Sequence, residues 1–238
     1  MAIGNETLKE VNELTFLGVV IDRKLNFDSH FHKVYKKASN GLRGLILAKN
    51  FLTYKAKKTI YHSLIHSHIT YCGIVWIERI KKSQLNQLIK LQKKAIRVIF
   101  NAKYNTHTSK FFQHSEITKV ENIFAKESME ISHKFHNRSL PKAILNMFNE
   151  SISDPNHLLR SMKNCALQPK RDIQGTTMYK ILGNWNSLGN SIREIKSHSE
   201  FKDSLKKKIL NITSTECNKS NCYSCNYDFE KIETLMKF

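Results

Sequence analysis

The residues with the clearest chemical potential are lysines and an arginine on one face of an expected helix. Between residues 83 and 100, apolar side chains recur every three or four residues, which predicts an amphipathic helix. The opposite side of this helix carries a basic stripe of Lys90, Lys93, Lys94 and Arg97. A solvated helix face usually mixes both signs of charge, but no acid occurs between Arg79 and Lys110. The basic stripe therefore favours contacts with phosphates over a merely solvated face.

Positive charge is concentrated in one third of the chain. The 238 residues include 39 Lys or Arg and 20 Asp or Glu, for a formal net charge of +19. Residues 31–110 hold seventeen basic residues and one acid, Glu78, whereas residues 1–30 carry −2 and residues 111–238 carry +5. Such self-repulsion costs stability unless a polyanion neutralises it. Nucleic acid is therefore the first partner to expect, and an anionic membrane surface is the second.

Carboxylates that could hold catalytic metals are sparse in this sequence. Nucleotidyl transfer and nuclease chemistry with two metals need converging carboxylates that hold ions about 4 Å apart. No two of the six aspartates are adjacent in the sequence. Asp22 and Asp28 flank an expected strand-to-helix turn, and a helix-capping role accounts for Asp28. The sequence also has no phosphate-cradling glycine loop and no nucleophile elbow. We therefore expect no catalytic residue in this chain.

Two groups of residues have a spacing that metal ligands use. His62 and His66 are four residues apart on an expected helix, which permits chelation, but they also suit a polyanion-binding face or simple packing. Near the end of the chain, three thiols lie within nine residues at Cys217, Cys222 and Cys225. A structural zinc site needs a fourth ligand, such as His198; without it the thiols are reduced cysteines in a loose tail.

The elements that must position these groups are mainly helical. An apolar, β-branched run over residues 14–21 predicts a buried strand in which Gly18 allows a bulge or a close backbone approach. A helix should begin at Ser29 with Asp28 or Ser29 as its cap, and a second should begin at Thr53. The apolar face of the second helix comprises Ala56, Ile60, Leu64 and Ile65. Further helices are expected over residues 120–135 and 201–210, and all three prolines fall between residues 141 and 169.

Targeting signals and cysteine usage indicate an intracellular protein. The first residues lack the apolar segment of a signal peptide. The longest apolar run, residues 71–77, is far shorter than the roughly 20 residues that span a bilayer. Five cysteines, an odd number, do not suggest a disulfide scaffold. We expect a nuclear or cytoplasmic location, or both, with reduced thiols and no transmembrane segment.

Several short motifs occur in an order and spacing that a known family shares. They are Phe16-Leu17-Gly18, Tyr61, Tyr71 to Trp76, residues 91–97 (Leu-Gln-Lys-Lys-Ala-Ile-Arg), His107-Thr108, Leu140-Pro141, His157 to Arg160, Trp185 to Leu188 and Phe201-Lys202. Together they resemble the C-terminal part of reverse transcriptases from non-LTR (LINE-type, jockey-like) retrotransposons, over roughly residues 11–212. The chain departs from the family pattern at Cys72, which is inserted before Gly73, and at Gly189, where the family usually has proline.

The resemblance implies a mainly α fold with a defined order of regions. A palm-end strand or hairpin is expected over residues 1–27, followed by a basic helical thumb-like domain over residues 28–110 and a helical continuation over residues 111–148. A linker-like stretch over residues 149–178 precedes a smaller, mostly helical C-terminal region over residues 179–238, which carries the cysteine-containing tail.

The resemblance also implies a role in RNA-directed DNA synthesis without catalysis by this chain. In the family, the catalytic aspartates that hold Mg²⁺ lie upstream of the Phe-Leu-Gly hairpin, so we expect no cofactor here apart from possible zinc. Phe16, Leu17 and Gly18 would lie near the primer terminus as primer-grip-like residues. The residues expected to contact phosphates of RNA or of an RNA–DNA hybrid are Lys33, Lys36, Lys37, Lys90, Lys93, Lys94 and Arg97.

Three interpretations of the chain remain open at this point. It is a detached part of a reverse transcriptase whose palm and fingers belong to a longer chain, or it is a stand-alone nucleic-acid-binding module. In the third, its basic amphipathic helices bind an acidic protein or a membrane surface.

Overall fold

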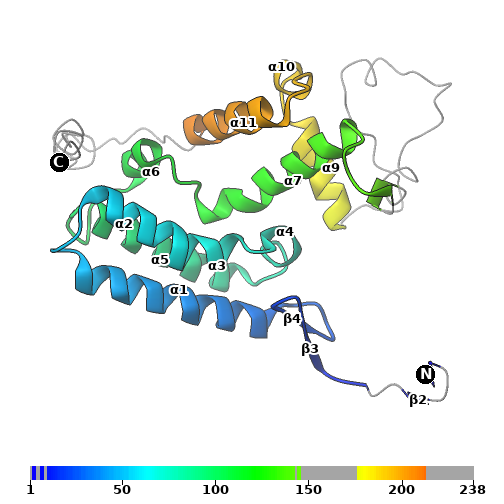
Figure 1. The fold of residues 1–238 in the computed structure, drawn as a ribbon, viewed down its shortest axis with the longest axis horizontal. Helices are drawn as coiled ribbons and strands as arrows, with labels where there is room; N and C mark the ends of the chain where they lie inside the picture. The colour runs from blue at the N-terminus through cyan, green and yellow to red at the C-terminus, as the bar shows by residue number, and fades with distance from the viewer. Residues whose placement is uncertain (1, 4–5, 8–9, 143, 146–175, 213–238) are drawn as a thin grey trace. The chain divides into compact units, whose positions relative to one another are not determined.

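Helices dominate the computed structural model, which describes residues 2–3, 6–7, 10–142, 144–145 and 176–212 (Figure 1). The chain divides into two compact units: one ends at Tyr104 and the other begins at Asn105. Of the described residues, 67% are helical, and the first unit also carries short antiparallel strand pairs near the N-terminus. The predicted mainly α fold with an N-terminal hairpin is confirmed.

The N-terminal hairpin consists of β3 (Glu13–Phe16) and β4 (Val19–Asp22), which pair antiparallel with Phe16 opposite Val19. A still shorter pair, β1 (Ala2–Ile3) and β2 (Glu6–Thr7), precedes it. The two residues that link β3 to β4, Leu17 and Gly18, both have positive φ, at 46° and 83°. Positive φ at both central positions is the type I′ geometry, whose twist matches that of the flanking strands.

The prediction of one buried strand over residues 14–21 is wrong. The chain reverses at Leu17 and Gly18, and the side chains of Leu14 and Phe16 are exposed while Val19 is buried. Apolar residues occupy both strands and the turn between them, so the run has the composition of a single strand. Gly18 is the signal for the reversal, because glycine adopts positive φ without steric cost.

The turn after β4 is organised by Asp22 and leads into α1 (Asp28–Ala48). One oxygen of the Asp22 carboxylate accepts from the backbone N–H groups of Lys24 and Asn26 at 2.9 and 3.1 Å, and the other from Phe27 N–H at 2.6 Å. The cap position of α1 is Phe27, at φ 58°, and no side chain caps the helix there. The expected capping role of Asp28 or Ser29 is therefore wrong, because Asp22 already holds the chain that enters the helix.

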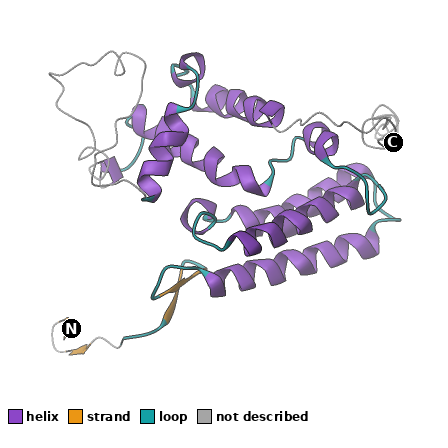
Figure 2. Ribbon diagram, turned by 180° about the vertical axis from the view of Figure 1, so that it is seen from behind, coloured by secondary structure: helices purple, strands orange, loops and turns teal. Residues whose placement is uncertain are grey.

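The other helices of the first unit are α2 (Tyr54–Tyr61), η1 (His62–His66), α3 (Ser67–Thr70), α4 (Gly73–Trp76) and α5 (Lys82–Ile99). In both views α1 lies alongside the layer that α2, η1 and α3 form, and it also contacts α5 (Figures 1 and 2). The core between them includes side chains with no exposed surface, namely Phe31, Leu45, Tyr61, Ile65, Trp76 and Leu88. The helices predicted from Ser29, from Thr53 and over residues 83–100 are confirmed.

The second helix departs from its predicted apolar face. Thr53 caps α2 as expected, and its hydroxyl accepts from the backbone N–H of Ala56 at 3.3 Å. The face then shifts: Ile65 is fully buried, but Leu64 is 47% exposed. The same displacement is already present in α2, where Lys57 and Tyr61 are buried while Ala56 and Ile60 of the predicted face are only half-buried.

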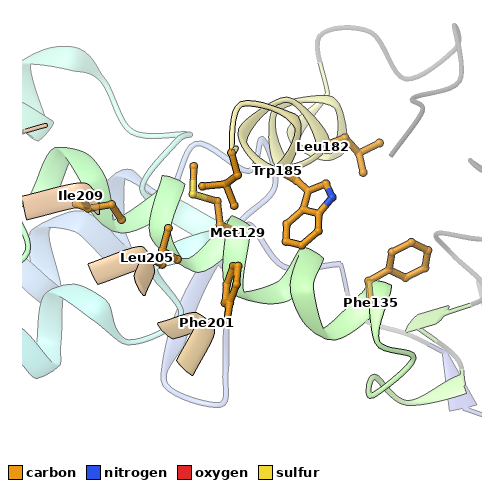
Figure 3. Close-up of a cluster of buried hydrophobic side chains, with 8 residues drawn as sticks. Met129, Phe135, Leu182, Trp185, Phe201, Leu205 and Ile209 are labelled. Atoms are coloured by element: carbon orange, nitrogen blue, oxygen red, sulfur yellow. The ribbon is translucent and has the colours of Figure 1, made fainter. Parts of the chain in front are cut away.

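The second unit comprises α6 (Ser109–Ser115), α7 (Val120–His136), α9 (Thr177–Asn186), α10 (Asn190–Arg193) and α11 (His198–Ile212). The helices predicted over residues 120–135 and 201–210 are confirmed as α7 and α11. A hydrophobic cluster joins α7, α9 and α11 and includes Met129, Leu182, Trp185, Phe201 and Leu205 (Figure 3). Residues 149–175 of the predicted linker lie outside the described residues, and its last two residues begin α9.

Candidate nucleic-acid interface

The basic stripe lies on the side of α5 that faces away from the core. Its core face is buried at Leu88, Leu91, Ala95 and Ile99. The side chains of Lys90, Lys93 and Lys94 are exposed, and that of Arg97 is half-buried. The helix thus folds as the sequence predicts, with its cations gathered opposite the apolar face.

A groove of about 770 Å³ runs between α1 and α5 and collects these cations, and we call it the basic groove. Its lining residues are Tyr35, Ser39, Leu42, Arg43, Ile46 and Leu47 from α1; Lys90, Leu91, Lys93, Lys94 and Arg97 from α5; and Tyr104. Five of them carry positive charge, and none of the described residues that line the groove is acidic. A groove with several cations suits a polyanion that contacts them at once.

Polar side chains hold α1 and α5 in register and so fix the groove. At one end, the Asp28 carboxylate accepts from Lys81 Nζ at 2.9 Å and from Gln84 Nε2 at 2.7 Å. The hydrogen bonds from Lys81 and Gln84 lower the pKa of Asp28, which keeps it charged and paired at neutral pH. Farther along α5, Gln92 Nε2 donates to the buried Tyr61 hydroxyl at 2.8 Å, which ties α5 to α2.

The predicted lysines of α1 divide between two sides of the helix. At about 100° per residue, Lys36 lies within ~20° of Arg43 and therefore beside the basic groove. Lys33 and Lys37 lie roughly 60–100° farther around the helix, away from the groove. By this helical geometry Lys36 lies next to the groove-facing side of α1, and Lys33 and Lys37 lie farther from it; none of the three is among the residues that line the groove.

Lys33 instead forms a hydrogen bond with the hairpin. Its Nζ donates to the backbone carbonyl of Gly18 at 3.2 Å, and the Tyr71 hydroxyl donates to the carbonyl of Leu17 at 2.7 Å. The two residues at the tip are therefore anchored to α1 and to the segment that follows α3. Phe16 and Leu17 remain 60% and 74% exposed. The three residues predicted as primer-grip-like thus form one exposed tip, about 15 Å along α1 from the level of Arg43.

Three groove residues were missed by reasoning from the sequence. Arg43, Tyr35 and Tyr104 line the groove with the predicted cations. The guanidinium carbon of Arg97 lies 6.0 Å from the centre of the Tyr104 ring, which is within cation–π range. Arg43 could have been found from its seven-residue spacing to Lys36, which puts both on one side of a helix, whereas Tyr104 lies beyond the helical pattern.

The residues with metal-ligand spacing lie partly inside and partly outside the described part of the chain. The thiols Cys217, Cys222 and Cys225 lie outside the described residues. Among the residues described, no group of three or more His, Cys, Asp or Glu side chains is arranged to hold a metal. The ring centres of His62 and His66 are 5.3 Å apart in a perpendicular contact. His198, the suggested fourth zinc ligand, has its Nδ1 3.2 Å from Nδ1 of the buried His133.

Comparisons of the chain with protein-family models, curated proteins and solved structures find no match. No helix in the described ranges is both long enough and apolar enough to cross a membrane.

Proposed function

We propose that the basic groove binds nucleic acid through contacts with its phosphates. The observation that carries the proposal is the groove itself, which lies between α1 and α5 and has five cations and no acidic lining residue among those described. Lysine and arginine on helix faces contact phosphates without reading bases. We therefore expect recognition by backbone shape and charge, with little dependence on sequence.

We further propose that the chain acts as the thumb-like, non-catalytic C-terminal part of a LINE-type reverse transcriptase that grips an RNA–DNA hybrid. The ordered motifs support this assignment, and so does the helical unit that carries the 91–97 motif on α5. A-form hybrids present regular phosphates along a wide, shallow minor groove, which suits recognition by shape. The exposed hairpin tip at Leu17 would then lie toward the primer terminus.

A charge-matched pair of triple variants tests the groove. In one variant, Lys90, Lys93 and Lys94 are changed to glutamine. In the other, three exposed lysines of the second unit are changed to glutamine: Lys196, Lys202 and Lys207. Both lose three positive charges, so a difference between them reports the location of the charges. We expect the groove variant to bind a labelled RNA–DNA hybrid much more weakly than the control variant, in fluorescence anisotropy at 100 mM salt. Equal losses in both would contradict the proposal.

The same proteins distinguish the alternative partners. Titration with an RNA–DNA hybrid, duplex DNA, single-stranded RNA and vesicles containing acidic lipid should show the hybrid bound most tightly at equal salt. A preference for vesicles would indicate that the groove binds a membrane surface. Equal binding of all the nucleic acids would support a stand-alone module over a hybrid-specific thumb.

A further inference from the structure

A second pocket, of about 460 Å³, lies at the end of α5. Its lining is mostly polar, whereas the lining of the basic groove also has a large apolar part. Its lining residues are Lys49, Asn50 and Leu52 after α1, Lys57 on α2, and Arg97, Val98, Asn101 and Ala102 at the end of α5. Three of these side chains are cationic and two are amides. No acidic residue is found among the described residues that line it.

Lys57 is the unusual member of this pocket, because it is only 2% exposed. Lysine is rarely buried unless it is paired with a carboxylate. Here Nζ donates to Asn101 Oδ1 at 2.7 Å, which uses one of its three protons. In the described part of the chain, Nζ makes no ion pair and no further hydrogen bond. Burial, reinforced by the nearby charge of Lys49, lowers the pKa of Lys57.

The partner of Lys57 is itself held in an unusual conformation. Asn101 has a φ of 50°, in the left-handed region that non-glycine residues adopt at some cost. Its backbone N–H donates to the carbonyl of Val98 at 3.2 Å as α5 ends. The side-chain amide is thereby directed at Lys57, which orients the ammonium within the pocket.

We propose that this pocket binds a phosphate group that carries two negative charges, either inorganic phosphate or the terminal phosphomonoester of a nucleic-acid strand. A phosphomonoester carries about −1.5 to −2 charges at pH 7 and offers three strong acceptor oxygens. Lys49, Lys57 and Arg97 match that charge, and the unused protons of Lys57 match those acceptors. Arg97 also lines the basic groove. A strand bound in the groove can therefore end in this pocket, and this extension alone rests on the proposed function.

The first experiment uses the whole chain and inorganic phosphate as the only ligand. The unfolding midpoint of the wild-type protein should rise with phosphate concentration when chloride is adjusted to constant ionic strength. The exposed Lys49 can be changed to glutamine without disturbing the core, and K49Q should weaken the apparent phosphate affinity about tenfold. K103Q removes a nearby exposed charge outside the pocket lining and should respond as the wild type does.

Replacing the buried lysine adds a second readout that a purely structural role would not give. Lys57→Met fills the same space without a charge, so the variant should unfold at an equal or higher midpoint in chloride while losing the phosphate-dependent rise. Asn101→Gly accommodates the positive φ and should also weaken the response. General salting-in or salting-out by phosphate affects all variants alike. Equal phosphate shifts in the wild type, K49Q and K57M, or no shift in any of them, would overturn the proposal.

A second experiment separates the two sources of the phosphate. Hybrids with a phosphate on the 5′ end, on the 3′ end or on neither are titrated against the wild type, K49Q and the Lys90, Lys93 and Lys94 triple variant. If a strand end occupies the pocket, the wild type prefers one phosphorylated hybrid, and K49Q loses that preference. If free phosphate is the ligand, the thermal shift remains without any end preference. The triple variant should keep the phosphate-dependent thermal shift even where hybrid binding fails, so the two proposals can fail independently.

Discussion

Replacing Gly41 by alanine tests how closely α1 must approach the π-helical turn that packs against it. A Cβ at residue 41 would lie 2.6 Å from the carbonyl oxygen of Leu64, which is closer than real Cβ atoms come, and 3.0 Å from its carbonyl carbon, which is a tight contact. These are backbone atoms, which cannot rotate away as a side-chain end can. Helix α1 must therefore move away from η1, or η1 must distort.

Gly44 provides the matched control, because it lies three residues farther along the same helix. A Cβ at residue 44 would have no atom within 4 Å. Alanine exceeds glycine in helix propensity by about 1 kcal/mol, so Gly44→Ala should raise the free energy of unfolding by roughly that amount. Gly41→Ala gains the same propensity but loses about 1–3 kcal/mol through overpacking. The difference between the two variants isolates the cost of the close approach.

Urea unfolding monitored by circular dichroism measures this difference. We expect the midpoint of Gly44→Ala to rise and that of Gly41→Ala to fall, with hybrid affinity lowered in the second because α1 forms one wall of the basic groove. If both variants are stabilised equally, α1 and η1 are not packed as closely as the structure has them, and the reasoning is refuted.

Three further predictions concern the hairpin tip, the groove aromatic and the second unit. Leu17→Asn should stabilise the hairpin by about 1 kcal/mol, because asparagine tolerates positive φ better than leucine. Slower amide exchange in β3 and β4 would show this stabilisation, and unchanged exchange would argue against the turn geometry. Tyr104 is 78% exposed and should stack on an unpaired base. Tyr104→Ala should therefore cost about 1–3 kcal/mol of binding free energy with single-stranded RNA and less with the hybrid. Equal losses in the two titrations would exclude stacking. Burial, together with the charge of Lys134, lowers the pKa of His198 below 6.5, so the unfolded chain binds protons more readily than the folded one. Stability is therefore full above about pH 6.5 and should fall on acidification, with a smaller fall in His198→Gln when urea unfolding is compared at pH 7 and pH 5.

The helices of the protein follow from its sequence because their apolar spacing is regular. The faces of α5 and α7 were predictable, since each buries residues that recur every three or four positions. The buried face of the second helix was not predictable, because it includes Lys57, and lysine is a residue type that is rarely buried. The family resemblance indicated the hairpin, but the apolar run over residues 14–21 did not, since Leu17 occupies a turn position that normally favours asparagine or glycine.

The cations on α5 that line the candidate site were predictable, but the groove that α1 and α5 form around them was not. The charge excess and helical spacing of α5 identified Lys90, Lys93, Lys94 and Arg97. Periodicity describes one helix at a time, so it could not show that α1 supplies Arg43 to the facing wall of the groove. Nor could it distinguish Lys33, which anchors the hairpin tip, from lysines beside the groove. The polar pocket around Lys57 depends on residues up to 53 positions apart and leaves no pattern in the sequence.

The salt dependence of hybrid binding tests the central claim most directly. If six phosphates are neutralised, the logarithm of the affinity should fall with the logarithm of salt concentration at a slope of about −4 to −5. Changing Lys90, Lys93 and Lys94 to glutamine should make this slope shallower by about 2–3, because three fewer counterions are released, whereas the Lys196, Lys202 and Lys207 control should leave it unchanged. A flat salt response in the wild type, or one slope shared by all three proteins, would contradict the assignment of the basic groove as a nucleic-acid interface.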